Sequence, residues 1–302
     1  MYTLKNECLT IQVNTYGAEL RSIRDNQTGI EYLWQADASY WGRSAPVLFP
    51  FVGASKDGQY VVDGVAYPMP QHGFARDMEF VFLPLEEEAD QSTIWFSLAS
   101  TPETLEKYPF AFELRIGYNL NGRDVKVLWE VHNTDSKEIC FSIGAHPAFH
   151  CPLVHANQGA PAYFQFDGNA ASRGSELLQE IKSRRLTAGL ASDIVDTYAL
   201  ENTSLEIRDE LFTYDALVIE HHQVQSISIA GPDRKPYVTV SFDAPLVGLW
   251  SPPGKNAPFV CIEPWYGRCD RIDFEGELKD REWGNRLSVG EVFRAAYTIH
   301  IC

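Results

Sequence analysis

Hydrophobic and polar residues alternate along most of this chain. The alternation recurs over residues 9–13, 112–118, 125–131, 238–242 and 293–301. A period of two places every second side chain on the same face, which is typical of half-buried β-strands. We therefore expect an all-β protein built mainly from antiparallel strands.

Short turn sequences separate these segments. Residues 60–67 hold an Asp63-Gly64 pair between two apolar segments, which predicts a hairpin with a tight turn. The Asn-Leu-Asn-Gly sequence at 119–122 joins the two segments on either side of it. Gly-Pro-Asp at 231–233 predicts a further turn. Strands joined by such short turns are expected to pair with their neighbours.

Helical periodicity is confined to two short segments. Residues 101–106 predict a short helix with Thr101 as its N-cap and Pro102 in its first turn. We expect a second short helix over residues 174–185. Many antiparallel strands with few helices indicate a large β-sandwich. Without an internal repeat or a convincing linker, residues 1–302 are predicted to form one domain.

Composition narrows the classes of partner. The chain has 302 residues, of which 45% are hydrophobic and 22% charged, as is ordinary for a soluble globular protein. Its net charge of −16 argues against nucleic acid or a membrane as partner, because both recruit basic patches. No apolar run approaches roughly 18 residues, and the start lacks a signal-peptide pattern. Six cysteines without a Cys-x-x-Cys motif favour reduced thiols and a cytoplasmic location.

Glu263 is the first candidate for chemistry. It follows the buried-strand pattern of residues 259–262 and precedes Pro264, which favours extended backbone. A carboxyl group at the end of a buried strand needs a raised pKa or a strong partner. A structural ion pair would satisfy Glu263 on its own, but Trp265 and Tyr266 resemble the aromatic wall of a ligand site. Trp265 also offers a flat surface on which a sugar ring could stack.

His146 is the second candidate. It lies among small apolar residues, where a lone histidine is more often a structural core residue than a catalytic one. His150 follows four residues later, but Pro147 disfavours the helix that would make the two a metal-binding pair. We therefore expect no metal site. Cys261 would share a strand face with Glu263, and we interpret it as core packing.

Four more polar residues lie in predicted loops or at a strand start. His72 and Arg76 follow the predicted hairpin, in a loop that Pro70 helps to define. Arg43 lies in an aromatic, proline-rich loop, and Asp215 directly precedes an apolar strand. Arginine presents a planar fork of donors, and loops on a rigid sheet often carry binding residues. Each residue alone could equally be a surface arginine or a turn aspartate.

Together these segments resemble the aldose 1-epimerase (galactose mutarotase-like) superfamily, most closely its bacterial LacX-like branch. The resemblance spans about residues 9 to 300. It rests on the order of the motifs, which are Arg43 near Phe49-Pro50, His72-Gly73-Phe74-Ala75-Arg76, Gly144-Ala145-His146-Pro147-Ala148-Phe149, Asp215, and Glu263-Pro264-Trp265. The resemblance implies a single large antiparallel β-sandwich with a sugar in an open cleft across one sheet.

The same resemblance implies roles for individual residues. Glu263 matches the catalytic base, His146 the general acid, and His72 a second histidine that helps to hold the sugar and its developing charge. Arg43 and Asp215 match sugar-binding positions.

Arg76 matches an arginine that helps to bind phosphate in the hexose-6-phosphate mutarotases of this superfamily. Those enzymes usually carry Arg-Gly-Gly-Pro in the earlier loop, whereas this chain has Arg-Ser-Ala-Pro at residues 43–46. The sequence therefore leaves open whether the substrate carries a phosphate.

The implied reaction interconverts the α and β anomers of an aldohexose or its 6-phosphate. Opening a cyclic hemiacetal needs a base at the C1 hydroxyl and an acid at the ring oxygen, and no cofactor. A small-molecule sugar is thus the expected partner, and a homodimer is left open. Two alternatives are a glycoside-processing enzyme that uses Asp215 and Glu263 as its two carboxylates, and a non-catalytic carbohydrate-binding protein of the same fold.

Overall fold

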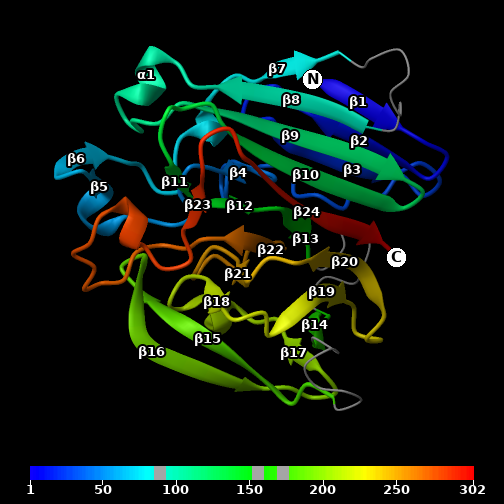
Figure 1. Cartoon of the computed structure of the whole chain (residues 1–302). Coiled ribbons are helices and arrows are strands. Elements are labelled where there is room, and N and C mark those ends of the chain that lie inside the picture. The colour runs from blue at the N-terminus through cyan, green and yellow to red at the C-terminus, as the bar shows by residue number, and fades with distance from the viewer. Residues whose placement is uncertain (85–92, 152–159, 169–176) are drawn as a thin grey trace.

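The computed structural model describes residues 1–84, 93–151, 160–168 and 177–302. Two large antiparallel sheets dominate this part of the chain (Figure 1). The nine-stranded sheet contains, in order, β17 (Ser204–Glu206), β14 (Tyr163–Gly168), β19 (Val224–Ala230), β20 (Pro236–Phe242), β24 (Val292–Ile301), β10 (Asp124–Asn133), β9 (Phe112–Asn121), β8 (Thr93–Ala99) and β7 (Val81–Leu83).

The eight-stranded sheet contains Glu263 and Trp265, and most of it lies below β8, β9 and β10 in Figure 1. Its order is β16 (Leu190–Ala199), β15 (Glu180–Thr187), β18 (Leu217–Ile219), β21 (Leu246–Trp250), β22 (Phe259–Tyr266), β12 (Ile143–Ala145) and β4 (Val47–Leu48), with β13 (Ala148–His150) paired to β22. The predicted all-β antiparallel fold is confirmed.

Smaller elements surround the two sheets. The short sheets are β1 (Tyr2–Lys5), β2 (Leu9–Val13) and β3 (Leu20–Asp25), then β5 (Gln59–Val62) with β6 (Val65–Pro68), and β11 (Ile139–Phe141) with β23 (Asn285–Leu287). The helices are α1 (Pro102–Leu105) and the 3-10 turns η1 (Lys56–Gly58), η2 (Ala75–Asp77), η3 (Asp209–Phe212) and η4 (Leu278–Asp280). None of these helices is long and apolar enough to cross a membrane, as far as the chain is described.

One of the two predicted helices is confirmed. Thr101 caps α1, and its side-chain oxygen accepts a hydrogen bond from the Thr104 backbone N–H at 3.3 Å. The helix predicted over residues 174–185 is wrong, because β15 begins at Glu180 and pairs with both β16 and β18. Buried and exposed residues alternate along much of β15, which is the pattern of a strand with one face turned to the interior. Residues 174–176 lie outside the described part.

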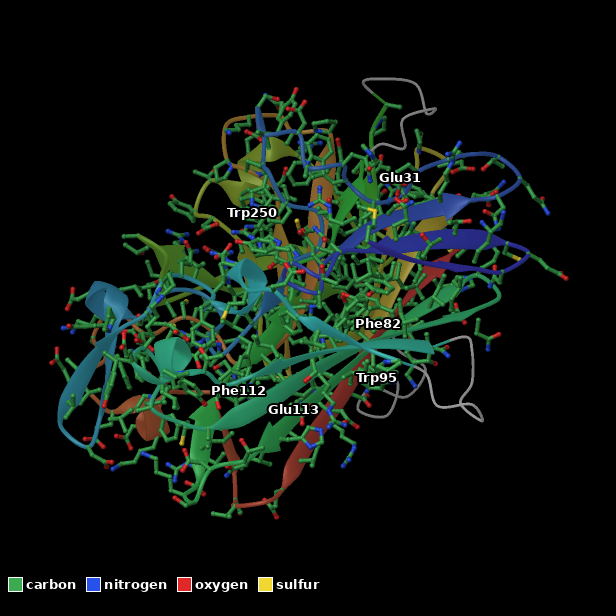
Figure 2. The ribbon with its side chains drawn as sticks, turned by 90° about the horizontal axis from the view of Figure 1, so that it is seen from above. Glu31, Phe82, Trp95, Phe112, Glu113 and Trp250 are labelled. Atoms are coloured by element: carbon green, nitrogen blue, oxygen red, sulfur yellow. The ribbon has the colours of Figure 1, made fainter. Side chains whose placement is uncertain are left out.

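Buried apolar residues from both sheets form one core, to which Phe112 of β9, labelled in Figure 2, belongs. The inward residues of β9 and β10 are almost fully buried, with Trp129 of β10 among the largest, as are Tyr297, Ile299 and Ile301 of β24. The buried apolar residues extend continuously from β1–β3 to the eight-stranded sheet. A rigid support of this kind lets loops at the sheet surface hold side chains in fixed positions.

An ion pair fastens β3 to the β9–β10 turn. The Asp25 carboxylate accepts hydrogen bonds from the backbone N–H groups of Gln27 and Thr28, each at 2.8 Å, and from Arg123 at 2.9 Å. Burial alone would raise the pKa of Asp25, but these donors lower it to about 2. The ionised carboxylate is therefore part of the folded structure at neutral pH.

Candidate active site

Glu263 lies inside a fully buried strand. The sequence placed it at the end of a strand, but β22 continues through Pro264 to Tyr266. In the register with β21, Glu263 is opposite Gly248, so its carboxyl group emerges on the face of the sheet. Its exposed fraction is 1%, and neither carboxyl oxygen has a hydrogen-bond partner among the described residues. A buried carboxyl in this state is ready to bind a hydroxyl group of a ligand.

The register of β12 against β22 brings His146 to Glu263. Gly144 pairs with Trp265 in antiparallel register. His146, two positions after Gly144, therefore lies near Glu263, two positions before Trp265. Nε2 of His146 is 3.4 Å from Oε2 of Glu263, within ion-pair distance. Nδ1 of His146 is buried, and no hydrogen-bond partner for it exists in the described part of the chain.

Burial sets the protonation of this pair. It raises the pKa of Glu263 well above its usual range, and the nearby Asp215 carboxyl adds to the rise. It lowers the pKa of His146 to about 3, with further lowering by Arg76 and Arg43. Because the two shifts are opposite, the pair holds a single proton over the neutral range. Either group can thus give or receive that proton.

The imidazole of His146 is held by aromatic rings. Trp41 stacks on it with ring centroids 4.7 Å apart and an interplanar angle of 26°. Trp250 meets it edge-on at 5.3 Å, and His72 does so at 5.6 Å. Since its Nδ1 atom is unpaired, these rings are the main restraint on its orientation. Figure 2 labels Trp250, which comes from β21 and lies away from Phe82 and Trp95 of the nine-stranded sheet.

His72 is fixed in one tautomer by Gly53. The Gly53 backbone N–H donates to Nδ1 of His72 at 3.1 Å, and the His72 backbone N–H donates to the Gly53 carbonyl at 2.8 Å. Nδ1 is therefore an acceptor, and a neutral ring carries its proton on Nε2. Burial, with the nearby His146 and Arg76, lowers the pKa of His72 well below its usual value. His72 is thus a neutral hydrogen-bond donor.

The geometry of Gly53 permits this arrangement. Its φ is +73°, in the left-handed region, and a Cβ there would lie 2.6 Å from the Cys269 side chain. A larger residue would strain the backbone and displace Cys269.

Two arginines share one aspartate at the edge of the site. Nη2 of Arg43 is 2.7 Å from Oδ1 of Asp77, and Nε of Arg76 is 3.8 Å from Oδ2 of the same carboxylate. Arg76 also donates to the Gln71 carbonyl at 2.7 Å, while its buried Nε atom lacks a hydrogen-bond partner in the described structure. Two guanidinium groups against one carboxylate leave this corner positively charged.

A buried glutamate shapes the loop that carries Arg43. Glu19 accepts hydrogen bonds from the backbone N–H groups of Ser44 and Ala45 at 2.7 and 3.0 Å. The loop leads directly into β4, which pairs with β12 just before His146. The Ser-Ala sequence therefore forms an ordered turn beside the candidate site.

Asp215 adopts a left-handed backbone conformation, with φ of 73°, just before β18. Burial raises the pKa of its carboxyl group, and hydrogen bonds from the Trp250 side chain and the Ala216 backbone limit the rise. These donors orient the carboxyl group and leave it able to accept a hydroxyl group.

All seven residues singled out in the sequence line one cavity of about 390 Å³. They are Arg43, His72, Arg76, His146, Asp215, Glu263 and Trp265. The volume is within the range of small-molecule sites. The cavity combines an unpaired carboxyl group, two neutral histidines, aromatic walls and a cationic edge.

Residues 1–282 match the sequence model of the aldose 1-epimerase family. The chain belongs to this family. It is 33% identical over 307 aligned residues to the plasmid-encoded protein LacX of Lactococcus lactis subsp. lactis, covering 99% of this chain and 98% of the relative. The resemblance inferred from the motifs is confirmed.

Solved structures agree with this assignment. A galactose mutarotase related enzyme from Lactobacillus acidophilus superposes with a TM-score of 0.89 at 33% identity, covering 100% of this chain and 97% of the other. A galactose mutarotase-like protein from Lactobacillus casei gives 0.86 at 27% identity and covers 100% of both chains. The fold is galactose mutarotase-like.

Within this family fold, the aromatic surfaces of the cavity differ from the sequence expectation. Trp265 forms part of the lining but is only 5% exposed, because its indole lies over two glycines. A Cβ at Gly248 or Gly144 would lie 2.4 or 2.6 Å from that ring. Trp265 therefore offers little surface for a sugar ring to stack on.

Trp41 and Trp250 are the more accessible aromatic residues, and sequence reasoning missed both as site residues. Trp41 is two residues before Arg43 in the same loop, and this closeness to a candidate residue could have identified it from the sequence. Trp250 ends β21 and had no motif around it.

Proposed function

We propose that this protein is an aldose 1-epimerase that interconverts the α and β anomers of an aldohexose or its 6-phosphate. The observation that carries the proposal is the buried Glu263 carboxyl group. It lacks a hydrogen-bond partner in the described structure, lies 3.4 Å from His146 and faces the cavity. A sugar hydroxyl group would supply the missing partner.

In the proposed reaction, the active form of the pair carries its proton on His146. The Glu263 carboxylate takes the proton from the C1 hydroxyl group, while the His146 imidazolium donates its proton to the ring oxygen. The bond between C1 and the ring oxygen breaks, leaving an aldehyde and a hydroxyl group. Rotation about C1–C2 presents the other face of the aldehyde, and the reverse steps close the ring. Each proton-transfer group typically contributes about 10²–10⁴-fold.

His72 and Asp215 are proposed to position the sugar. The Gly53 N–H occupies Nδ1 of His72, so the Nε2–H remains available to donate a hydrogen bond to a sugar oxygen. Asp215 can accept from a sugar hydroxyl group. Because His72 is neutral, its donation does not add a competing acid to the Glu263–His146 pair.

Arg43 and Arg76 are proposed to select the far end of the substrate. Their excess positive charge suits a phosphate, and the fork of a guanidinium group binds phosphate oxygens in pairs. Replacing Arg76 with alanine should then lower kcat/KM for hexose 6-phosphates more than for free hexoses. Arg185→Ala, which removes a surface arginine paired with Asp196, is the matched control. An equal loss for both sugar classes would assign Arg76 to the sugar ring or to the scaffold.

Polarimetry tests the function itself. Freshly dissolved α-galactose, α-glucose and their 6-phosphates should lose optical rotation faster with the protein than without it. The non-catalytic alternative predicts sugar binding without any acceleration. A cytoplasmic location, a single domain and a homodimer remain predictions from the sequence.

A further inference from the structure

We infer that His146, Cys261 and Glu263 form a zinc site beneath the sugar cavity, and that Zn²⁺ inhibits the protein by occupying it. One ligand atom from each residue, a ring nitrogen, the thiol sulfur and a carboxyl oxygen, lies within 4.8 Å of the other two. All three residues are buried. The binding claim stands on this geometry, and the inhibition claim rests on the proposed function.

The strand registers explain why these three residues meet. Cys261 and Glu263 are two residues apart on β22, so they share one face of the sheet. Ala148 of β13 pairs with Cys261, while Gly144 of β12 pairs with Trp265. His146 lies midway along the chain between Gly144 and Ala148. These two pairings therefore bring it close to both Cys261 and Glu263.

The separations suit a tetrahedral metal ion. With zinc bonds of about 2.0–2.2 Å to nitrogen and oxygen, two such ligands lie roughly 3.4 Å apart. Nε2 of His146 and Oε2 of Glu263 are 3.4 Å apart. With a bond of about 2.3 Å to sulfur, the thiolate should lie roughly 3.6 Å from each of them. The three ligand atoms lie within 4.8 Å of one another, so the sulfur has to approach the other two by no more than about 1.2 Å.

The donors also need partners. Both carboxyl oxygens of Glu263 lack hydrogen bonds within the described part of the chain, although the residue is 1% exposed. Thiolate, imidazole and carboxylate are the ligands that structural and catalytic zinc sites use. A bound Zn²⁺ ion with one thiolate, one carboxylate and a neutral imidazole has no net charge, so its burial is not opposed by an unbalanced charge.

The cavity gives the ion a route and a fourth ligand. His146 and Glu263 line the cavity, while Cys261 lies one layer deeper in an apolar cluster with Trp34, Ala148 and Phe259. The side of the zinc site that faces the cavity is free to hold a water molecule. As the ion binds, the Cys261 thiol and the Glu263–His146 pair each release one proton to the buffer. The ion uses the same Glu263 and His146 atoms as the proposed reaction, so zinc and sugar should exclude each other.

Cobalt spectroscopy of the full-length protein tests binding without any assay of activity. Co²⁺ should give a near-ultraviolet thiolate-to-metal charge-transfer band and the intense visible bands of a tetrahedral site, and Zn²⁺ should displace both. Cys261→Ser should abolish the charge-transfer band and weaken Zn²⁺ binding at least about tenfold by calorimetry. Cys269→Ser is the matched control, because Cys269 is a buried cysteine that lines the same cavity but lies outside the zinc site.

Inhibition is measured in the same variants, each against its own zinc-free rate. Zn²⁺ should slow anomeric exchange by the wild type and by Cys269→Ser, and a chelator should restore it. In Cys261→Ser the inhibition constant should rise at least about tenfold. If anomeric exchange is absent, the proposed function fails, and the cobalt spectra still decide the zinc site.

Two results would overturn the inference. One is a wild-type protein that gives no thiolate charge-transfer band with Co²⁺. The other is Zn²⁺ binding that is equal in the wild type and Cys261→Ser, or is lost in Cys269→Ser instead. The wild-type spectrum needs no variant, so it decides the question even if Cys261→Ser does not fold.

Discussion

Replacing Glu263 with glutamine should separate catalysis from stability. Gln keeps the shape of a protonated glutamate but cannot act as a base. Loss of one proton-transfer group should slow anomeric exchange about 10²–10⁴-fold. This corresponds to about 3–5 kcal/mol in activation free energy. Sugar binding should largely remain, because the glutamine amide still lines the cavity and can form hydrogen bonds with the sugar.

The folded protein should not be weakened by this change. Burial raises the pKa of Glu263, so the folded state binds this proton more tightly than the unfolded state does. Glu263 taken alone therefore contributes a loss of stability as the pH rises above 4.5, the ordinary pKa of a glutamate, by about 1.4 kcal/mol per pH unit until the raised pKa is reached. Glutamine does not titrate. The stability of Glu263→Gln relative to the wild type should thus increase with pH above 4.5.

Glu220 provides the matched control. It is a buried glutamate that directly follows β18 of the same sheet, but it accepts hydrogen bonds from Nε of Arg184 at 2.8 Å and Nε of Arg268 at 2.7 Å. Glu220→Gln leaves the almost fully buried Arg268 without this carboxylate. Breaking a buried ion pair in this way should cost about 3 kcal/mol. Two chemically identical substitutions should therefore have opposite effects on the free energy of unfolding.

Urea unfolding of both variants and the wild type at several pH values measures these differences. Nuclear magnetic resonance measures anomeric exchange in the same samples. Near-wild-type exchange by Glu263→Gln would refute the assignment of Glu263 as the base. A loss of stability equal to that of Glu220→Gln would mean that Glu263 is a structural ion-pair partner instead.

Three further predictions concern other parts of the structure. A ¹⁵N–¹H correlation spectrum should show the His72 proton on Nε2, and a protonated Nδ1 at neutral pH would contradict the proposed donor. Trp41→Leu should lower kcat about 2–10-fold by releasing the His146 ring, while Trp41→Phe should retain most activity; equal losses would argue against stacking. Asp25→Asn should cost about 1–2 kcal/mol at pH 7, an effect present above pH 3.8 and lost as the pH falls through about 2. Acid and urea unfolding measure this pH dependence, and a loss of stability that does not change with pH would contradict the prediction.

The sequence predicted the strands well because alternation is a local property. Residues 112–118 and 125–131 fall within β9 and β10, and the Asp63-Gly64 turn joins β5 to β6. The helix over 174–185 failed because pairing of β15 on both sides outweighed local preference.

The candidate residues converge because their motifs are held in separate loops and strands that meet on one sheet. What sequence could not provide was the register between those strands. The burial of Trp265 depends on Gly144 and Gly248, which are distant in sequence and adjacent only in the folded sheet. The proximity of Cys261 to His146 depends on pairing between β13 and β22 in the same way.

The central claim is that the Glu263–His146 pair opens the sugar ring. Proton magnetic resonance with saturation transfer between the α and β signals of equilibrated galactose, glucose and their 6-phosphates tests it most directly. The account predicts transfer that depends on the wild-type protein and disappears with Glu263→Gln. Sugar binding without any transfer by the wild-type protein would contradict it.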